Sequence, residues 1–372
     1  MKPANNYRVF IAAILLLAGA GVELAREHRP SVLRRGLRLC AYVSSADGNV
    51  SVVDLVRLAV IAKIPVGPAP SGLREHPTRK EIWGVSTAGN YAWVIDATRD
   101  QVAARIPVGA SPFAIDFSPD GKRAYVASSG SATVVAIDCA SRLVVASART
   151  GWRPWLARVT PDGKYVLVPN RDASTLSVFD AAALRPLATI AVAANPEQVA
   201  ILPDSSSAFV SATGTHQISV VNLRRRVLVA NLPVEGEPVD LILKPDGGEL
   251  YVTSPEAHGM EVIDTQSNEV GDSLVLGFSP THGILTADSS VLYVSDAASG
   301  RLMPVDINVR RLRTPISVGQ HPGMARFDPN EKILLVVNEG SSDLAVIRVS
   351  TGSLITMIPV GYHPNNIAVK LF

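Results

Sequence analysis

Residues 112–138, PFAIDFSPDGKRAYVASSGSATVVAID, contain the pattern that decides the fold. An alternating run after a proline leads into the turn sequence SPDG, then into a second apolar run, AYV, and a third that ends at Asp138. Short alternating runs separated by Pro, Asp and Gly are typical of β-strands joined by tight turns. A further run, of the kind seen at 102–108, precedes the next proline. The stretch therefore predicts four strands, named A to D in chain order.

The pattern recurs every 42 residues along the chain. The last residue of strand C keeps this spacing at Asp54, Asp96, Asp138, Asp180, Asn222, Asp264, Asp306 and Arg348. The proline before strand A keeps it at Pro70, Pro112, Pro154, Pro196, Pro238, Pro280, Pro322 and Pro364. The Asp of the SPDG-like turns forms a third column in the same register. Three columns with one period indicate a repeat protein.

The repeats predict a closed ring. A single four-stranded unit cannot bury both of its faces, so the units are expected to pack face to face as a β-propeller. The chain enters at strand B near Tyr42 and ends with one extra strand A at 366–372. That strand is expected to complete the first unit and to leave no open edge. We therefore predict an all-β fold with a single propeller of eight four-stranded blades at 40–372, in preference to seven blades.

The N-terminal residues resemble a targeting segment. Residues 1–20 have a basic start, an apolar run that begins at Val9, and small residues at 18–20, which predicts a signal peptide. The apolar run is too short for a comfortable membrane span of about 20 residues. Residues 21–39 are expected to be a basic tether. The protein is accordingly expected to be periplasmic or secreted, with membrane contact only if this segment stays uncleaved.

Composition excludes several classes of protein. Apolar residues make up 47% of the chain, which excludes a disordered protein. The formal net charge of +2 comes from the N-terminal segment, and the near-neutral remainder predicts no nucleic-acid partner. The two cysteines, Cys40 and Cys139, fall in non-adjacent repeats and are expected to be free thiols. A disulfide framework, a c-type haem and a Cys zinc site are therefore not expected. The protein is also expected to be a monomer.

The strand B sequences AYVSS (41–45), AYVAS (124–128) and YVTS (251–254), with IPVG at 64–67, resemble the YVTN-type β-propeller repeat. That family includes archaeal surface-layer propellers and periplasmic YncE-like proteins, and it is more distantly similar to haem d1-binding and lactonase-type propellers. The resemblance implies an extracytoplasmic, mostly non-enzymatic binding protein, often with seven blades. The eight repeats depart from that number and match the haem d1 domain. No catalytic residue is carried over.

Candidate site residues lie on one face of the ring. The D–A and B–C loops share that face, whereas the repetitive turns of the other face are explained by structure alone. The predicted ligand-binding residues at the channel mouth are Arg153, Trp155, Glu197, Glu237, Asp240 and Asn365. The predicted metal or axial haem ligands are His282, His321 and His363, although no two have a short-range ligand spacing. His321 and His363 are alternatively plain loop residues. His216 and His258 are expected to be turn residues, and the strand C Asp column is expected to cap turns.

The motifs of common enzyme classes are missing from the sequence, which has no H-E-x-x-H, G-x-S-x-G or P-loop. We assign no catalytic residue. The sequence predicts a non-catalytic extracytoplasmic propeller that binds a protein or a small ligand on its D–A/B–C face. One alternative is a lactonase-like hydrolase with Arg153 as anion clamp and Glu237, His321 or His363 as acid–base groups. Another is a propeller that binds haem d1 or a metal. The cofactor is not identified.

Overall fold

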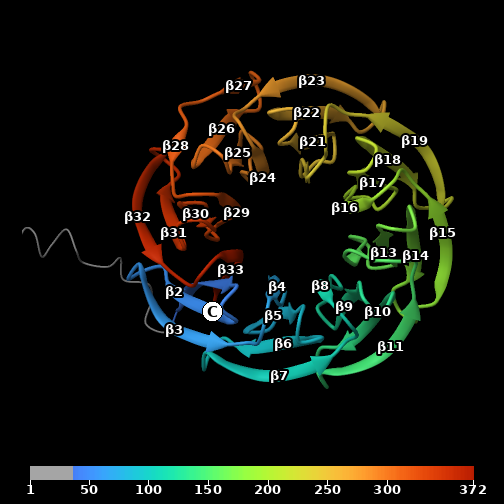
Figure 1. Cartoon of the computed structure of the whole chain (residues 1–372), viewed down its shortest axis with the longest axis horizontal. Helices are drawn as coiled ribbons and strands as arrows, with labels where there is room; N and C mark the ends of the chain where they lie inside the picture. Colours follow the sequence, from blue (N-terminus) through green and yellow to red (C-terminus); the bar gives the residue numbers. More distant parts are fainter. Residues whose placement is uncertain (1–36) are drawn as a thin grey trace, which may run out of the picture.

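Eight antiparallel sheets form a closed ring around a central axis (Figure 1). The computed structural model describes residues 37–372, and these contain no helix. The predicted all-β propeller with eight blades, built from the 42-residue repeat, is confirmed. In each blade strand A lies innermost and strand D outermost, so the eight A strands surround the axis.

The strands of the first four blades are as follows. Blade 1 has β1 (Leu39–Ser45), β2 (Asn49–Asp54), β3 (Ala59–Pro65) and β33 (Pro364–Leu371). Blade 2 has β4 (Pro70–Glu75), β5 (Glu81–Ser86), β6 (Tyr91–Asp96) and β7 (Gln101–Pro107). Blade 3 has β8 (Pro112–Phe117), β9 (Arg123–Ser128), β10 (Thr133–Asp138) and β11 (Leu143–Arg149). Blade 4 has β12 (Arg158–Val159), β13 (Tyr165–Asn170), β14 (Thr175–Asp180) and β15 (Pro186–Ala191).

The other four blades repeat the same order. Blade 5 has β16 (Pro196–Ile201), β17 (Ser207–Ala212), β18 (Gln217–Asn222) and β19 (Val227–Pro233). Blade 6 has β20 (Asp240–Leu243), β21 (Glu249–Ser254), β22 (Gly259–Asp264) and β23 (Glu269–Val275). Blade 7 has β24 (Pro280–Leu285), β25 (Val291–Asp296), β26 (Arg301–Asp306), β27 (Arg311–Leu312) and β28 (Ile316–Ser317). Blade 8 has β29 (Pro322–Phe327), β30 (Ile333–Asn338), β31 (Asp343–Arg348) and β32 (Ser353–Pro359).

Blade 7 departs from the four-strand pattern because its outer strand is split. Strands β27 and β28 both pair with β26, one on each side of Pro304. Proline has no backbone N–H to donate to a neighbouring strand. A second proline, Pro315, lies in the interrupted segment itself. The ladder is therefore broken between β27 and β28.

The ring closes between the two ends of the described chain. Strand β33 pairs antiparallel with β1, with Leu39 opposite Leu371, and completes blade 1 as predicted (Figure 1). It begins at Pro364, two residues before the expected start. Strand β1 begins at Leu39, and Arg38 already exchanges backbone hydrogen bonds with Phe372. Residues 38 and 39, expected in the tether, therefore belong to the propeller.

The core lies between neighbouring blades. Strands B and C are buried on both faces, as in β6, whose four central residues are all buried, because each blade is covered by a neighbour on either side. The outer strand β7 alternates between exposed and half-buried residues up to Arg105, and Ile106 is buried. Trp83 of blade 2, for example, packs edge-on against Phe117 of blade 3 with ring centroids 5.8 Å apart.

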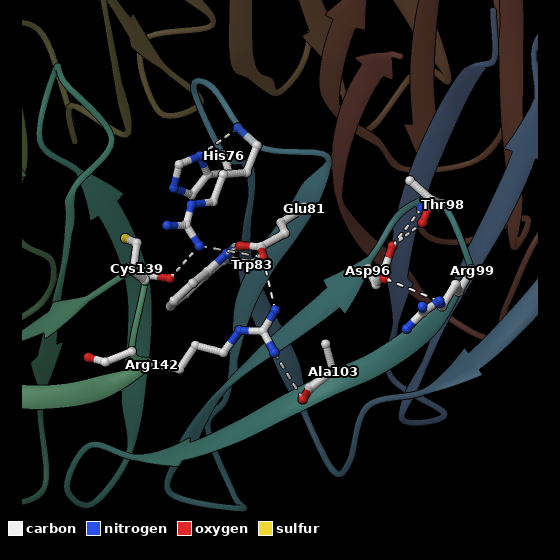
Figure 2. Close-up of polar contacts among 12 residues, drawn as sticks. His76, Glu81, Trp83, Asp96, Thr98, Arg99, Ala103, Cys139 and Arg142 are labelled. Carbon is white, nitrogen blue, oxygen red and sulfur yellow. Dashed lines mark hydrogen bonds and ion pairs between the residues drawn. The ribbon is translucent and has the colours of Figure 1, made fainter. Parts of the chain in front are cut away.

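Polar contacts also join neighbouring blades, as Figure 2 shows between blades 2 and 3. The Glu81 carboxylate accepts a hydrogen bond from Trp83 Nε1 at 2.9 Å. Its other oxygen pairs with Arg142, from the turn after β10, also at 2.9 Å. The Arg142 guanidinium in addition donates to the Ala103 carbonyl of blade 2 at 3.2 Å. Glu81 thereby fixes the C–D turn of blade 3 against blade 2.

The predicted capping role of the strand C Asp column is confirmed. In Figure 2 the Asp96 carboxylate accepts hydrogen bonds from Thr98, at 2.9 Å from the backbone N–H and 2.6 Å from Oγ1. Backbone N–H groups two or three residues onward also donate to Asp54, Asp138, Asp180, Asn222, Asp264 and Asp306. The column therefore stabilises turns and is not a charged ring.

Both cysteines are buried free thiols, as predicted. Burial raises the pKa of Cys40 to about 11 and that of Cys139 to about 12. The predicted signal peptide and most of the predicted tether lie outside the described residues. Within 37–372, no helix is present that could cross a membrane.

Candidate ligand-binding channel

A cavity of about 410 Å³ occupies the central channel, next to the D–A loops. Residues from all eight inner strands, or from the segments leading into them, form its wall. Two further hollows, of about 350 and 450 Å³, lie among the A–B and C–D turns of the opposite face. Those hollows are lined mainly by the repetitive turn residues. The central cavity is therefore the place where residues that differ between repeats converge.

A bulge in strand A determines which side chains line the cavity. In blade 3 the pairing of β8 with β9 shifts register between Pro112 and Ile115. The same shift occurs in blades 2, 5, 7 and 8. A bulge places an extra residue on one strand and re-aims its side chains. Consequently two successive residues, such as Phe113 and Ala114, both line the cavity.

One wall of the cavity is aromatic. The rings of Phe113 and Trp155 stack with their centroids 4.3 Å apart. The guanidinium of Arg171 lies 5.4 Å from the Trp155 ring centroid and forms a 3.1 Å ion pair with Glu197. Burial raises the pKa of Glu197 above its ordinary value. Blades 3 to 5 thus supply an aromatic surface whose edge carries a paired carboxylate.

Arginines line the cavity deeper in the channel. Arg74, Arg158 and Arg326 occupy the same position of the repeat, four residues after the proline. Arg74 pairs with Asp116 at 3.4 Å. Arg158 forms no ion pair within the part of the chain that the structure describes, and Arg326 donates only to the neighbouring Ala325 carbonyl, at 3.0 Å.

The pKa values of the two unpaired arginines reflect this setting. Burial, followed by repulsion from Arg74, lowers the pKa of Arg158 to about 10. The same two causes lower the pKa of Arg326. Sequence reasoning missed these arginines. The sequence signal that could have found them is the repeat position four residues after the proline. In the other five repeats this position holds Asp116, Ala200, Ile242, Ile284 and Ala368.

An acid–imidazole pair lies on the other side of the channel. His282 lines the cavity, and its Nδ1 is 3.6 Å from a carboxylate oxygen of Asp240. Asp240 also accepts backbone hydrogen bonds from Leu241 and Gly283, each at 3.0 Å. Burial by itself would raise the pKa of Asp240, but His282 and these two donors bring it below its ordinary value. Burial would likewise lower the pKa of His282, but Asp240 raises it.

The predicted binding residues divide into two groups. Trp155, Glu197 and Asn365 line the cavity, and Asp240 lies behind His282. Asn365 is held by hydrogen bonds to Ser44 and to the Pro70 carbonyl. Arg153 and Glu237 are exposed outside the cavity, and Arg153 forms a 3.5 Å ion pair with Asp172.

The predicted metal-ligand histidines are not brought together. His282 is in the channel, whereas His321 and His363 lie in the loops before their prolines, with φ of 48° and 46°. His363 lies 3.6 Å from Glu339. Residues 37–372 contain no group of three His, Cys, Asp or Glu side chains placed to hold a metal ion. The acid–base groups named for the hydrolase alternative do not line the cavity either.

The remaining histidines of this face occupy turn positions. His216 and His258 lie in B–C turns with φ of 49° and 56°. The corresponding residues of other repeats, such as Asn90 and Ala132, have the same left-handed backbone conformation. Their place in the repeat therefore explains them without a ligand.

A sequence model of the YNCE-like beta-propeller family matches residues 83–292. This chain belongs to that family. The predicted YncE-like membership is thereby confirmed, over residues that include the aromatic wall and, of the three channel arginines, Arg158. No curated protein matches the chain significantly.

Solved structures share the fold of this YNCE-like propeller at low sequence identity. The dihydro-heme d1 dehydrogenase NirN in complex with DHE has a TM-score of 0.77 and 19% identity, covering 91% of this chain and 76% of that one. Hydrazine synthase of Kuenenia stuttgartiensis has a TM-score of 0.62 and 20% identity, covering 76% and 96%. Sqt1 of Saccharomyces cerevisiae has a TM-score of 0.71 and 12% identity, covering 80% and 86%. Proteins with such different names have the same architecture, so these similarities establish the fold alone.

Proposed function

We propose that this YNCE-like propeller is a non-catalytic, extracytoplasmic binding protein that takes a small ligand into the mouth of its central channel. The observation that carries the proposal is the convergence of non-repetitive side chains from all eight blades on one cavity. A concave site of this size, with an apolar wall and a few polar groups, is typical of small-molecule binding. The YncE-like and NirN-like folds support a periplasmic location.

Two tryptophans allow a matched test of where the ligand binds. Trp155 lines the cavity, whereas Trp152 is 75% exposed in the same D–A loop and lies outside the cavity. Native mass spectrometry of the protein purified from its own source should show a small co-purifying ligand. We expect Trp155→Ala to lose that ligand and Trp152→Ala to retain it.

Loss of the ligand in Trp152→Ala but not in Trp155→Ala would place the binding site outside the cavity. A partner lost only in Trp152→Ala would indicate a protein docked on the outer rim of the loops, where Phe278 and Tyr362 are also exposed. A wild-type protein that carries no ligand, and that binds none from an extract of its source, would overturn the proposal.

A second candidate is a cofactor-binding propeller of the haem d1 type. Two observations favour it: the fold match to the NirN complex, and the Asp240–His282 pair in the channel. In a histidine that ligates a metal, the other ring nitrogen commonly donates a hydrogen bond to a carboxylate. Arginines can bind the acidic side groups of a cofactor through charge-assisted hydrogen bonds. The residues present therefore fit such a group, with His282 as ligand and the channel arginines as anion partners.

A bound tetrapyrrole would supply a redox-active metal centre, while the chain itself would orient the ring and exclude water. An absorption spectrum of the purified protein tests this candidate. A Soret-region band that is lost in His282→Ala would support it, and a colourless protein that takes up no haem in reconstitution would exclude it.

A further inference from the structure

The charges that line the channel are unbalanced. Two carboxylates behind its wall, Asp116 and Asp240, already have partners, in Arg74 for the first and His282 for the second. Asp116 also accepts a hydrogen bond from the Val159 backbone at 3.0 Å. Asp240 accepts two backbone hydrogen bonds of its own. Each acid therefore already has a side-chain partner of its own, and neither lies within ion-pair distance of Arg158 or Arg326.

Among residues 37–372, Arg158 and Arg326 find no ion-pair partner. Arg158 comes from blade 4 and Arg326 from blade 8, so in a ring of eight they approach the axis from opposite sides (Figure 1). Both line the same cavity. Both side chains are half-buried, and a partly desolvated charge without a partner carries an energetic cost. Guanidinium groups bind oxyanions through paired, charge-assisted hydrogen bonds. A bound oxyanion between the two arginines would offset that cost.

A second part of the cavity wall is apolar. The stacked Phe113 and Trp155 rings face the channel nearer the mouth, and Leu156, Val239 and Met324 line it as well. Inorganic phosphate would leave these groups without contacts. Glu197, which could repel an anion, is engaged by Arg171.

We propose that the ligand of this channel is a small organic anion whose carboxylate or phosphate is held between Arg158 and Arg326 and whose apolar body packs against Phe113 and Trp155. This inference rests on the proposed function, because it assigns a chemical class to the ligand of the same cavity. A cavity of about 410 Å³ admits a small molecule and not a polymer.

Isothermal titration calorimetry of the purified protein tests the assignment with four probes. Phenyl phosphate and phenylacetate carry an anion and an aromatic body, inorganic phosphate carries the anion alone, and benzylamine carries the aromatic body with a cation. We expect phenyl phosphate or phenylacetate to bind, inorganic phosphate to bind roughly tenfold more weakly, and benzylamine not to bind. The preferred head group then distinguishes a carboxylate from a phosphate ligand.

Matched arginine variants locate the contact. We expect Arg158→Met and Arg326→Met each to weaken binding of the better aromatic anion by roughly tenfold or more. Arg153→Met should leave the affinity unchanged, since Arg153 is exposed and paired with Asp172. Arg158→Lys keeps the positive charge but lacks the planar guanidinium group that donates two parallel hydrogen bonds. This variant should bind the anion with intermediate affinity.

Thermal melting provides a second readout that does not depend on the probes. Removal of an unpaired, half-buried cation should leave the ligand-free melting temperature of Arg158→Met unchanged or higher, while the increase produced by the anion should disappear. If Arg158→Met does not fold, Arg158→Lys and Arg326→Met still test the assignment.

Binding of benzylamine in preference to the anions, or unchanged anion affinity in both Arg→Met variants, would overturn the inference. The proposed function can survive that failure. A co-purifying ligand that is neutral, is lost in Trp155→Ala and is retained in Arg158→Met would preserve the binding site and refute only the anion class.

Discussion

Arg38 and Phe372 exchange two backbone hydrogen bonds at the seam of the ring. The Arg38 N–H donates to the Phe372 carbonyl at 2.7 Å, and the Phe372 N–H donates to the Arg38 carbonyl at 2.9 Å. The Arg38 guanidinium lies 5.4 Å from the Phe372 ring centroid and also pairs with Asp100 of blade 2 at 2.8 Å. The two ends of the described chain therefore hold each other in blade 1.

Removal of the closing strand should open the ring. Deletion of residues 366–372 takes away most of β33, including the buried Ile367 and Ala368, and exposes the edge of β1. We expect aggregation in size-exclusion chromatography or a melting temperature lower by about 10 °C or more in calorimetry.

A circular permutant is the matched control for this deletion. A short loop from Phe372 to Arg38, with new ends between Gln266 and Ser267 in the turn after β22, keeps every strand. It should remain monomeric and melt within a few degrees of the wild type. Normal melting of the deletion variant would show that β33 does not close the ring.

Loss of a turn cap should cost a measurable amount of stability. Asp96→Ala removes the acceptor of both Thr98 hydrogen bonds, so we expect the free energy of unfolding to fall by about 1–2 kcal/mol. Asp96→Asn keeps an acceptor oxygen and should recover most of that loss. Urea unfolding at neutral pH measures both variants.

The effect of Asp96 should also depend on pH. Burial is the largest single influence and raises its pKa, but the hydrogen bonds from Thr98, together with Arg99, outweigh burial and lower it. A depressed folded-state pKa gives stability that is present above the unfolded value of 3.8 and is lost as the pH falls through the folded value. The difference between wild type and Asp96→Ala should therefore shrink in acid. A difference that stays constant would contradict this account.

The packing of Trp93 requires a glycine at position 84. A Cβ on Gly84 would lie 2.2 Å from Cζ2 of the buried Trp93 ring. Gly84→Ala should destabilise the protein by about 1–3 kcal/mol through overpacking. Trp93→Phe removes the clashing atoms, so the double variant should be less destabilised than the sum of the two single variants. Chemical denaturation of all four proteins completes the cycle, and strict additivity would argue against the contact.

The Asp240–His282 pair should be visible in an NMR titration. Asp240 raises the pKa of His282 above its ordinary 6.5 despite burial. We expect Asp240→Asn to lower that pKa below 6.5, because burial then acts without an opposing carboxylate. Nitrogen-detected histidine spectra measure both proteins, and His282→Gln assigns the signal. A wild-type value at or below 6.5 would contradict the pairing.

The same pair predicts the direction of a stability change. A raised folded-state pKa gives stability that is fully present below the unfolded value and is lost as the pH rises through the folded value. The melting advantage of wild type over Asp240→Asn should therefore be larger at about pH 5.5 than at about pH 8.5. The reverse order would show that His282 is not charged in the folded protein.

The fold could be derived almost completely from sequence because its information is local and periodic. Prolines, turn residues and strand ends recur every 42 residues, and each acts on its own neighbourhood, as the Asp96 cap shows. The number of repeats predicted eight blades. The extra strand A at the C-terminus predicted that the ring closes within blade 1. The split outer strand of blade 7 was missed, since it depends on Pro304 standing opposite the interrupted segment.

The channel was decided by tertiary structure. Arg158 and Arg326 are four repeats apart in sequence and line one cavity only because the ring places blades 4 and 8 on opposite sides of it. The strand A bulges brought Phe113 and Glu197 to the cavity, whereas His321 and His363 lie outside it, in loop positions with a left-handed backbone conformation. The repeat pattern determines where each backbone segment lies. The direction of a side chain, and the charges that surround it, depend on strands from distant repeats that exist as neighbours only after the ring has closed.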